Sequence, residues 1–155
     1  MSFEVRAEIA IDAPIAIVWD VITDVVRWSE WSTWLRYEGG AVALGSKLEL
    51  RLTPPNGGGY AFSPEVIALD PPSDTSEARF GWIGRTGVRG VFDGEHHFVL
   101  RAEGESTRLL HYERYSGLLS PLMAKLPAMR DAPAGFEAMN AEVKARAEAL
   151  ARRGA

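Results

Sequence analysis

The last third of the chain, from Ser120 to Arg153, contains a long stretch with the pattern of an amphipathic helix. After Pro133 there is no further proline, and apolar side chains recur every three or four positions at Phe136, Met139, Val143, Ala147 and Leu150. This spacing places them on one face of an α-helix, and the charged residues between them on the solvated face. Because the preceding sequence is mostly strand-like, the apolar face must pack against a sheet. The sequence therefore predicts a curved sheet around one long helix, with room between them for a small apolar molecule.

The first part of the chain predicts one strand followed by two short helices. Apolar and charged residues alternate over Phe3–Ile11, as in a half-buried strand. Asp12 is a candidate N-cap before Pro14, and helical spacing of apolar residues continues to Val26. Tryptophans at three-residue intervals then indicate a second short helix or turn: Trp28, Trp31 and Trp34. These rings either form a ligand-stacking wall or, as we favour, fill the junction between helices and sheet.

Six further strands are predicted from alternation and turn residues, and with the first strand they make a sheet of about seven strands. They are Tyr37–Val42, Leu48–Leu52, Pro64–Leu69, Ser76–Ile83, Val91–Ala102 and Thr107–Ser116. Gly39-Gly40 predicts a bulge in the first of these. Glycines every third residue between Gly81 and Gly90 resemble a phosphate loop, but no Gly-Lys-Ser/Thr follows, so we expect a bent crossing between strands. The fold class is α+β, and residues 1–155 are expected to form a single domain.

The last two predicted strands form a hairpin whose pairing can be calculated. A two-residue loop at Gly104-Glu105 makes the numbers of paired residues sum to 209. Phe98 then lies opposite His111, and His96 lies opposite Glu113. Because their neighbours on the same face are apolar, we expect His96 and Glu113 to meet inside the cavity and to form a hydrogen bond, directly or through water.

Several motifs together resemble the START/Bet v 1-like (SRPBCC) superfamily, in particular its polyketide cyclase/dehydrase and lipid-transport branch. The resemblance covers nearly the whole chain and lies in the order and spacing of Ile11-Asp12-Ala13-Pro14, Val18-Trp19, Asp24, Trp31, residues 92–98, residues 113–119 and residues 136–140. It implies a helix-grip fold whose cavity binds a lipid, sterol, polyketide, quinone or hormone, and in a minority of members catalyses cyclisation or dehydration. One departure is that Pro127 and Pro133 interrupt the approach to the last helix, so Ser120–Leu126 is expected to be a separate turn acting as a hinged lid.

The inward faces of these elements supply the residues that we expect to bind a ligand. They are Trp31, Trp82, Phe92, His96, Phe98, His111, Glu113, Tyr115, Leu122, Met123, Phe136 and Met139. The patch of Leu118, Leu119, Leu122, Met123 and Leu126 is either buried core or the moving lid, and the sequence leaves both open.

The polar residues of this face admit three interpretations. His96, His111 and Glu113 have the residue types of a two-histidine, one-carboxylate metal site, but nothing indicates a facial arrangement, and we expect no metal and no cofactor. His96 and Glu113 are candidate acid/base residues. We favour a hydrogen-bonded patch that orients the polar end of a ligand. His97 is expected on the surface; Arg85 and Arg89 either receive an anionic group at the cavity mouth or are solvated.

Composition excludes several other functions. The 155 residues carry a net charge of −4 without a basic cluster, which disfavours a nucleic-acid partner. The absence of cysteine excludes disulfides, zinc thiolates and thiol nucleophiles. Neither a signal peptide nor a membrane-spanning stretch is recognisable, so we expect a cytoplasmic protein without stable membrane insertion.

We therefore expect binding, and by extension transport, of a hydrophobic or amphipathic small molecule such as a lipid, polyketide or aromatic compound. The alternative is a cyclase/dehydratase that uses His96 and Glu113 for acid/base catalysis on a polyketide-like substrate. A third class, a chaperone-binding module, is disfavoured because the sequence shows no apolar strand or basic face suited to docking; a large exposed apolar patch would favour it.

Overall fold

Two antiparallel sheets and a long C-terminal helix make up the structure, a computed structural model that describes residues 2–55, 57–74 and 77–154. The strands are β1 (Ser2–Ile11), β2 (Leu35–Gly40), β3 (Leu48–Leu52), β4 (Tyr60–Phe62), β5 (Glu65–Asp70), β6 (Glu77–Thr86), β7 (Phe92–Glu103) and β8 (Ser106–Ser116). The helices are α1 (Ile15–Thr23), the 3₁₀ helix η1 (Val25–Glu30), α2 (Ser120–Met123) and α3 (Pro127–Gly154). Among the described residues, no helix is long and apolar enough to cross a membrane.

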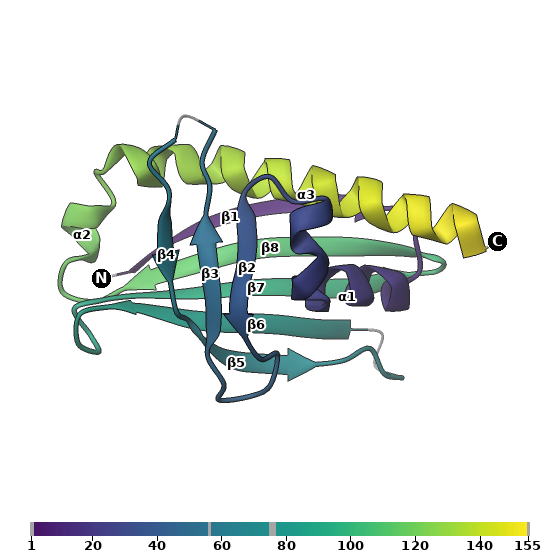
Figure 1. Ribbon diagram of the computed structural model, residues 1–155, viewed down its shortest axis with the longest axis horizontal. Helices are drawn as coiled ribbons and strands as arrows, with labels where there is room; N and C mark the ends of the chain where they lie inside the picture. The colour runs from purple at the N-terminus through teal and green to yellow at the C-terminus, as the bar shows by residue number, and fades with distance from the viewer. Residues whose placement is uncertain (1, 56, 75–76, 155) are drawn as a thin grey trace.

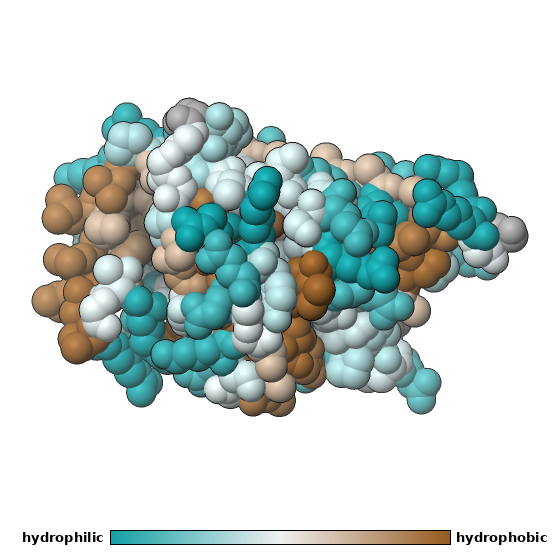
Figure 2. All heavy atoms as spheres, viewed as in Figure 1, coloured by the Kyte–Doolittle hydropathy of each residue, from teal (hydrophilic) through white to brown (hydrophobic). Residues whose placement is uncertain are grey.

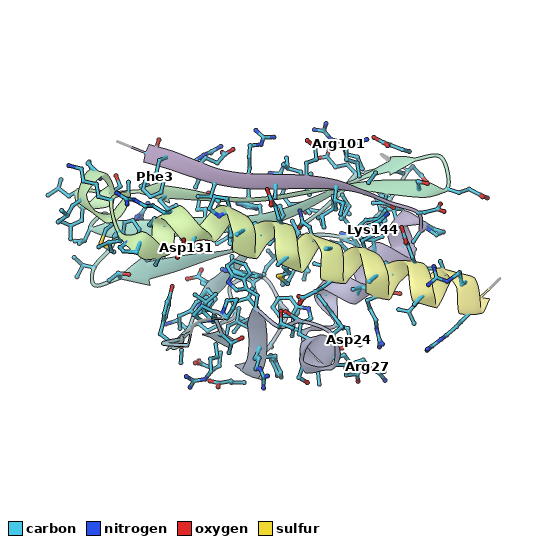
Figure 3. All side chains as sticks on the ribbon, turned by 90° about the horizontal axis from the view of Figure 1, so that it is seen from above. Phe3, Asp24, Arg27, Arg101, Asp131 and Lys144 are labelled. Atoms are coloured by element: carbon cyan, nitrogen blue, oxygen red, sulfur yellow. The ribbon has the colours of Figure 1, made fainter. Side chains whose placement is uncertain are left out.

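The five-stranded sheet has the order β1-β8-β7-β6-β5, and the three-stranded sheet has the order β2-β3-β4. In Figure 1 the three short strands cross in front of the long ones, and α3 runs along the length of the molecule beside β1. Viewed from above in Figure 3, α3 lies along the gap between the two sheets. This arrangement confirms the predicted α+β fold with a sheet wrapped around one helix.

The core lies where α3 and the two sheets meet. Phe136, Met139 and Val143 are fully buried, which confirms the apolar face predicted for this helix. Met139 and Val143 pack in one cluster with residues of both sheets, including Leu48, Leu50 and Phe98. Phe136 packs in a second cluster with Val5 and Phe3. The helix therefore joins the two sheets through side chains.

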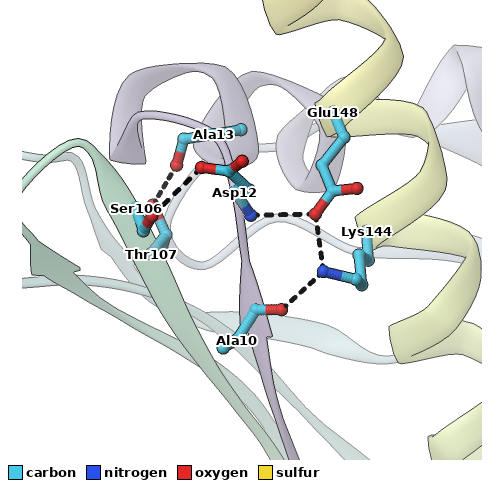
Figure 4. Close-up of polar contacts among 7 residues, drawn as sticks. All are labelled: Ala10, Asp12, Ala13, Ser106, Thr107, Lys144 and Glu148. Carbon is cyan, nitrogen blue, oxygen red and sulfur yellow. Dashed lines mark hydrogen bonds and ion pairs between the residues drawn. The ribbon is translucent and has the colours of Figure 1, made fainter.

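Polar contacts at the far end of α3 fix it to the start of the chain (Figure 4). The Glu148 carboxylate accepts hydrogen bonds from the Asp12 backbone N–H at 2.9 Å and from Lys144 Nζ at 2.5 Å. Lys144 also donates to the carbonyl oxygen of Ala10 at 3.0 Å. Asp12 is not the predicted N-cap, since α1 has no side-chain cap and the Asp12 carboxylate instead accepts a hydrogen bond from Ser106 Oγ at 3.2 Å. The N-cap position is Pro14, and Asp12 instead joins the β1–α1 connection to β8 and α3.

The structure differs from the predicted strands in number and grouping. Residues 2–55, 57–74 and 77–154 contain eight strands instead of about seven, because Tyr60–Phe62 forms a short strand beside β3 directly after the predicted loop. One isolated bridge, Lys47↔Glu65, is the backbone pairing between the two sheets within the described residues. The bulge predicted at Gly39-Gly40 is confirmed as a register shift between Tyr37 and Gly39. The predicted strand start at Ser76 lies outside the described residues.

Two short helices follow β1 as predicted, but their bounds differ: α1 ends at Thr23 instead of continuing to Val26, and η1 ends at Glu30, before Trp31 and Trp34. α2 is a separate short turn, as expected from Pro127, and η1 provides the second short helix after β1. Pro133 does not interrupt α3, which continues through it from Pro127. Pro133 lies past the first turn of α3, where a proline removes no bond, so the helix continues through it at the expense of the backbone hydrogen bond to Met129.

Candidate functional site

The β7–β8 hairpin has the predicted register. Glu103 pairs with Ser106 across the turn, and each pair of numbers along the ladder sums to 209. His96 therefore lies opposite Glu113, with its Nδ1 atom 3.4 Å from Glu113 Oε2. The meeting of these two side chains on the inner face of the sheet is confirmed.

The pair belongs to a longer series of buried polar contacts, which we call the polar chain: Asn140, His111, His96, Glu113 and Tyr115. His111 Nδ1 lies 2.9 Å from Asn140 Oδ1, and His111 Nε2 lies 2.6 Å from His96 Nε2. At the other end, the Tyr115 hydroxyl donates to Glu113 Oε2 at 2.7 Å. The polar chain draws its residues from three elements. His96 is on β7, Asn140 is on α3, and His111, Glu113 and Tyr115 are on β8.

Hydrogen counting constrains the direction of the hydrogen bonds in the polar chain. Two neutral imidazoles carry one N–H each, so the three contacts between Asn140 and Glu113 need a third donor, and the Asn140 amide supplies it when its NH₂ group faces His111 Nδ1. Asn140 then donates to His111, His111 Nε2–H donates to His96, and His96 Nδ1–H donates to Glu113. Pointing the other way, the same buried NH₂ group has no partner among the described residues. The hydrogen bonds therefore all run from α3 towards the carboxylate.

Aromatic rings enclose the two histidines. Trp82 stacks on His96 with ring centroids 4.3 Å apart, and Phe136 stacks on His111 at 4.2 Å. The pKa of His111 is lowered well below its ordinary value, mainly by burial and secondly by the neighbouring His96. The pKa of Tyr115 is raised, mainly by burial and secondly by the Glu113 carboxylate. Tyr115 therefore keeps its proton and acts as a hydrogen-bond donor.

Gly94 makes room for the Glu113 carboxylate. A Cβ atom at Gly94 would lie 2.6 Å from Glu113 Oε1, closer than real Cβ contacts allow, and 3.4 Å from the ring of Tyr115. Gly94 is paired directly with Tyr115 in the β7–β8 ladder. The absence of a side chain on this residue lets the carboxylate fold against the strand and reach His96.

Two cavities adjoin the Tyr115 end of the polar chain. The larger has a volume of about 710 Å³ and is bounded by the β3–β4 loop and the first turns of α3. Its lining is Thr33, Trp34, Leu52, Thr53, Pro54, Pro55, Gly57, Gly58, Tyr60, Tyr115, Pro127, Ala128, Met129, Asp131, Ala132, Ala134, Gly135 and Ala138. The smaller, of about 90 Å³, is lined by Phe62, Trp82, Gly84, Arg85, Thr86, Phe92, Gly94, Glu113 and Tyr115. Tyr115 is common to both, so its ring separates the large cavity from Glu113.

The structure divides the expected ligand-binding residues into three groups. Those that line a cavity are Trp82, Phe92, Glu113 and Tyr115. Those buried behind the cavities are His96, Phe98, His111, Phe136 and Met139. Trp31 packs edge-on against Trp28 as part of the helix–sheet junction, Met123 is half-buried, and Leu122 is exposed on α2. Of the expected polar residues, Tyr115 and Glu113 therefore line a cavity, whereas His96 and His111 do not.

Two residues that matter for this arrangement, Tyr60 and Asn140, were not expected from the sequence. Tyr60 lines the large cavity from β4. Trp34, for which the sequence left a ligand-stacking wall open as the less favoured alternative, lines the same cavity and packs edge-on against Phe136 at 5.1 Å. Asn140 completes the polar chain. It could have been found, because it lies four residues after Phe136 on the apolar face of the helix, where an unpaired amide would be costly.

Three other expectations about polar residues need revision or comment. His97 is on the outer face of the sheet but is buried, because Gly81 leaves space for its ring and Tyr112 stacks on it at 5.1 Å. Arg85 lines the small cavity and pairs with Glu65 at 3.7 Å, whereas Arg89 is exposed. The contact between the two Nε2 atoms of His96 and His111 is a shared hydrogen bond; within the described part of the chain, no three residues of ligating type form a metal-binding group.

Comparisons with known proteins identify relatives of the whole structure. A family model described as polyketide cyclase / dehydrase and lipid transport matches residues 2–154. Among solved structures, a hypothetical protein from Helicobacter pylori superposes with a TM-score of 0.72 at 15% identity, covering 94% of this chain and 88% of that one. The Zhui aromatase/cyclase from Streptomyces sp. R1128 gives 0.69 at 15% identity, covering 96% and 94%. Norcoclaurine synthase from Thalictrum flavum gives 0.62 at 13% identity, covering 93% and 85%. These likenesses show the fold; no curated protein matches the chain.

Proposed function

This chain belongs to the polyketide cyclase/dehydrase and lipid transport family, and on that premise we propose that it binds a hydrophobic or amphipathic small molecule in its large cavity. The observation that carries the proposal is a cavity of about 710 Å³ in which Tyr115 connects an apolar wall to the buried polar chain. Cavities of roughly 300–1,000 Å³ with few, well-placed polar groups are typical of small-molecule sites. Lipids, polyketides and aromatic compounds meet that description.

The lining indicates how such a ligand would lie. Its apolar body would rest between the proline- and glycine-rich β3–β4 loop and the alanine-rich first turns of α3, with Trp34 against it. Its polar end would approach Tyr115, whose hydroxyl is held by Glu113. A ligand hydroxyl there would donate a hydrogen bond to the oxygen of a phenol whose own hydrogen is held by the Glu113 carboxylate, which favours one orientation of the ligand.

Binding in the large cavity can be tested by enlarging a side chain that lines it. Ala134 lines the cavity from α3, whereas Ala145 is an exposed alanine on the same helix outside the lining. Titration with anilinonaphthalene sulfonate, oleic acid and anthraquinone carboxylate, followed by fluorescence, should give saturable binding of at least one probe to the native chain. Ala134→Trp should weaken that binding by about tenfold or more, because a large ring takes up ligand volume. Ala145→Trp should bind as the native chain does, and equal loss in both variants, or no binding at all, would refute the assignment.

The polar chain favours a second candidate function, acid/base catalysis of cyclisation. An intramolecular aldol condensation forms one carbon–carbon bond and releases one water. Because Tyr115 lies between the large cavity and Glu113, its hydroxyl would take the first proton from the attacking carbon while passing its own hydrogen to Glu113, which is paired with His96. The hydrogen would return by the same route to the carbonyl oxygen as the carbon–carbon bond forms. A second transfer from the same carbon to the new hydroxyl releases water, so both protons that the carbon loses leave in that water.

Glu113→Gln separates the two functions. If Glu113 only anchors a ligand, Glu113→Gln should weaken binding of the probes, and neither the variant nor the native chain should turn over a substrate. If it is an acid/base residue, a synthetic linear polyketone should lose one water in the presence of the native chain, as measured by mass spectrometry, and Glu113→Gln should abolish that loss while binding is nearly retained. Absence of turnover with the native chain would leave binding as the function.

A further inference from the structure

One end of the molecule carries an exposed group of apolar side chains, which we call the apolar end: Val88, Leu118, Leu119, Leu122 and Leu126. Leu118 is 87% exposed, Val88 72% and Leu122 63%. Figure 2 shows apolar side chains gathered at the end where Figure 1 places α2. The patch that the sequence left open as core or lid is therefore exposed apart from the half-buried Met123, and an exposed apolar surface is present where the sequence indicated none.

Two segments that are distant in sequence build the apolar end, and backbone hydrogen bonds join them. The Leu118 N–H donates to the Gly90 carbonyl oxygen at 3.0 Å, and the Leu119 N–H donates to that of Val91 at 2.9 Å. Val88, in the β6–β7 turn, is thereby held beside the segment that leads into α2. The exposed side chains form one fixed surface, which a monomeric protein in water would not be expected to retain without a use for it.

Basic side chains predominate around this surface, although the whole chain has a net charge of −4. Residues 84–92 and 114–130 contain Arg85, Arg89, Arg114, Lys125 and Arg130 and no acidic residue, and they are bordered by Asp93, Glu113 and Asp131. Arg85 and Arg114 form ion pairs with Glu65 and Glu4. Within the described residues, the other three cations have no ion-pair partner. An apolar surface with uncompensated cations fits a partner that offers apolar groups beneath a layer of negative charge.

We propose that the apolar end docks on the surface of an anionic lipid bilayer. The leucine side chains enter the boundary between headgroups and acyl chains, and Arg89, Lys125 and Arg130 lie among the anionic headgroups. A second copy of the chain fits less well, because a two-fold contact would bring Arg89 and Lys125 of both copies to the same interface. α2 has four residues, which is far too short to cross a bilayer, so the contact is with the membrane surface only.

Docking at this end does not depend on a ligand, yet it bears on how a ligand would enter. Leu126 directly precedes Pro127, which is the first residue of α3 and lines the large cavity. A bilayer in contact with α2 would therefore lie next to the wall of the cavity that α3 contributes. Membrane binding and probe binding can be measured separately, so either proposal can fail without the other.

The surface can be tested by co-sedimentation with vesicles of phosphatidylcholine alone and of phosphatidylcholine mixed with phosphatidylglycerol. The native chain should sediment with the anionic vesicles, and high salt should release it. Leu118→Asp/Leu122→Asp should reduce the bound fraction about tenfold or more. The matched control is Leu44→Asp, because Leu44 is 63% exposed, as Leu122 is, but lies between β2 and β3; it should bind as the native chain does.

A second variant, Arg89→Glu/Lys125→Glu, tests whether the basic side chains contribute to membrane binding. It keeps the apolar side chains, and its binding to the anionic vesicles should also fall about tenfold. It replaces the leucine variant in the test if circular dichroism shows that the leucine variant does not fold. Failure of the native chain to sediment, or equal binding by all variants, would overturn the proposal. A native dimer in size-exclusion chromatography that Leu118→Asp/Leu122→Asp converts to a monomer would assign the surface to a second copy and overturn it too.

Discussion

His111 and His97 are both buried, on opposite faces of the five-stranded sheet, and both resist protonation in the folded chain. Burial is the main cause that lowers both pKa values; the second cause is the neighbouring His96 for His111 and the Arg79 guanidinium for His97. In the unfolded chain each would titrate near the ordinary value of about 6.5. The unfolded state therefore binds more protons than the folded state below that pH, and stability must fall as the pH falls.

We expect the free energy of unfolding to be constant with respect to these histidines above about pH 7. Between about pH 6.5 and about pH 5.5 it should decrease, by at most about 1.4 kcal/mol per pH unit for each histidine. Urea unfolding followed by circular dichroism at several pH values measures this slope. His97→Gln should remove one share of it, and a native chain whose stability rises on acidification over this range would contradict the assignment.

The space left by Gly94 is specific to the carboxylate of Glu113. Gly94→Ala should destabilise the fold by about 1–3 kcal/mol, because its Cβ atom would lie 2.6 Å from Glu113 Oε1. Glu113→Ala removes that atom, so the cost of Gly94→Ala should be smaller in the Glu113→Ala background. Gly84→Ala is the matched control, since a Cβ atom there meets nothing within 4 Å. Urea unfolding of the four combinations measures the coupling, and additive effects would rule out the steric explanation.

Among the elements, α3 depends most on Phe136, whose ring is fully buried between the polar chain and Trp34. It stacks on His111 at 4.2 Å and meets Trp34 edge-on at 5.1 Å. Because no face of the ring is open to a cavity, Phe136→Ala should cost about 3–5 kcal/mol in chemical unfolding. Leu150→Ala, at a half-buried position on the same helix, should cost clearly less. A loss below about 1 kcal/mol for Phe136→Ala would show that the packing is not tight.

The segment from Ser120 to Asp131 should be the less stable end of the helical layer. α2 is short and exposed, and Pro133 cannot donate the hydrogen bond that the Met129 carbonyl would otherwise accept. Amide hydrogen exchange should therefore be faster in this segment than in β7 and β8. Pro133→Ala should restore the bond and slow exchange in the first turns of α3, leaving the two strands unchanged. Exchange in residues 122–130 as slow as in the central strands would contradict a yielding segment.

For the molecule as a whole, sequence patterns located the layers because periodicity reports which face of an element is buried. The hairpin count placed His96 opposite Glu113, since a two-residue turn fixes the register of both arms. The contact of His111 with Asn140 depends on where α3 crosses the sheet, which no local pattern encodes. β4 was missed because three residues are too few for alternation to be recognised, and exposure of Leu118 could not be foreseen because an apolar run looks the same whether or not it is covered.

The two sheets are expected to unfold together. Their backbones share one bridge within the described residues, Lys47↔Glu65, but their side chains form a common core with α3. Leu50, in the three-stranded sheet, is fully buried in this core. Leu50→Ala should cost about 2–5 kcal/mol and shift the whole transition, with tryptophan fluorescence and far-ultraviolet circular dichroism remaining coincident. If the variant instead shows two separate transitions, or if calorimetric and van't Hoff enthalpies differ in the native chain, the three-stranded sheet is an independent unit and the single-domain expectation is wrong.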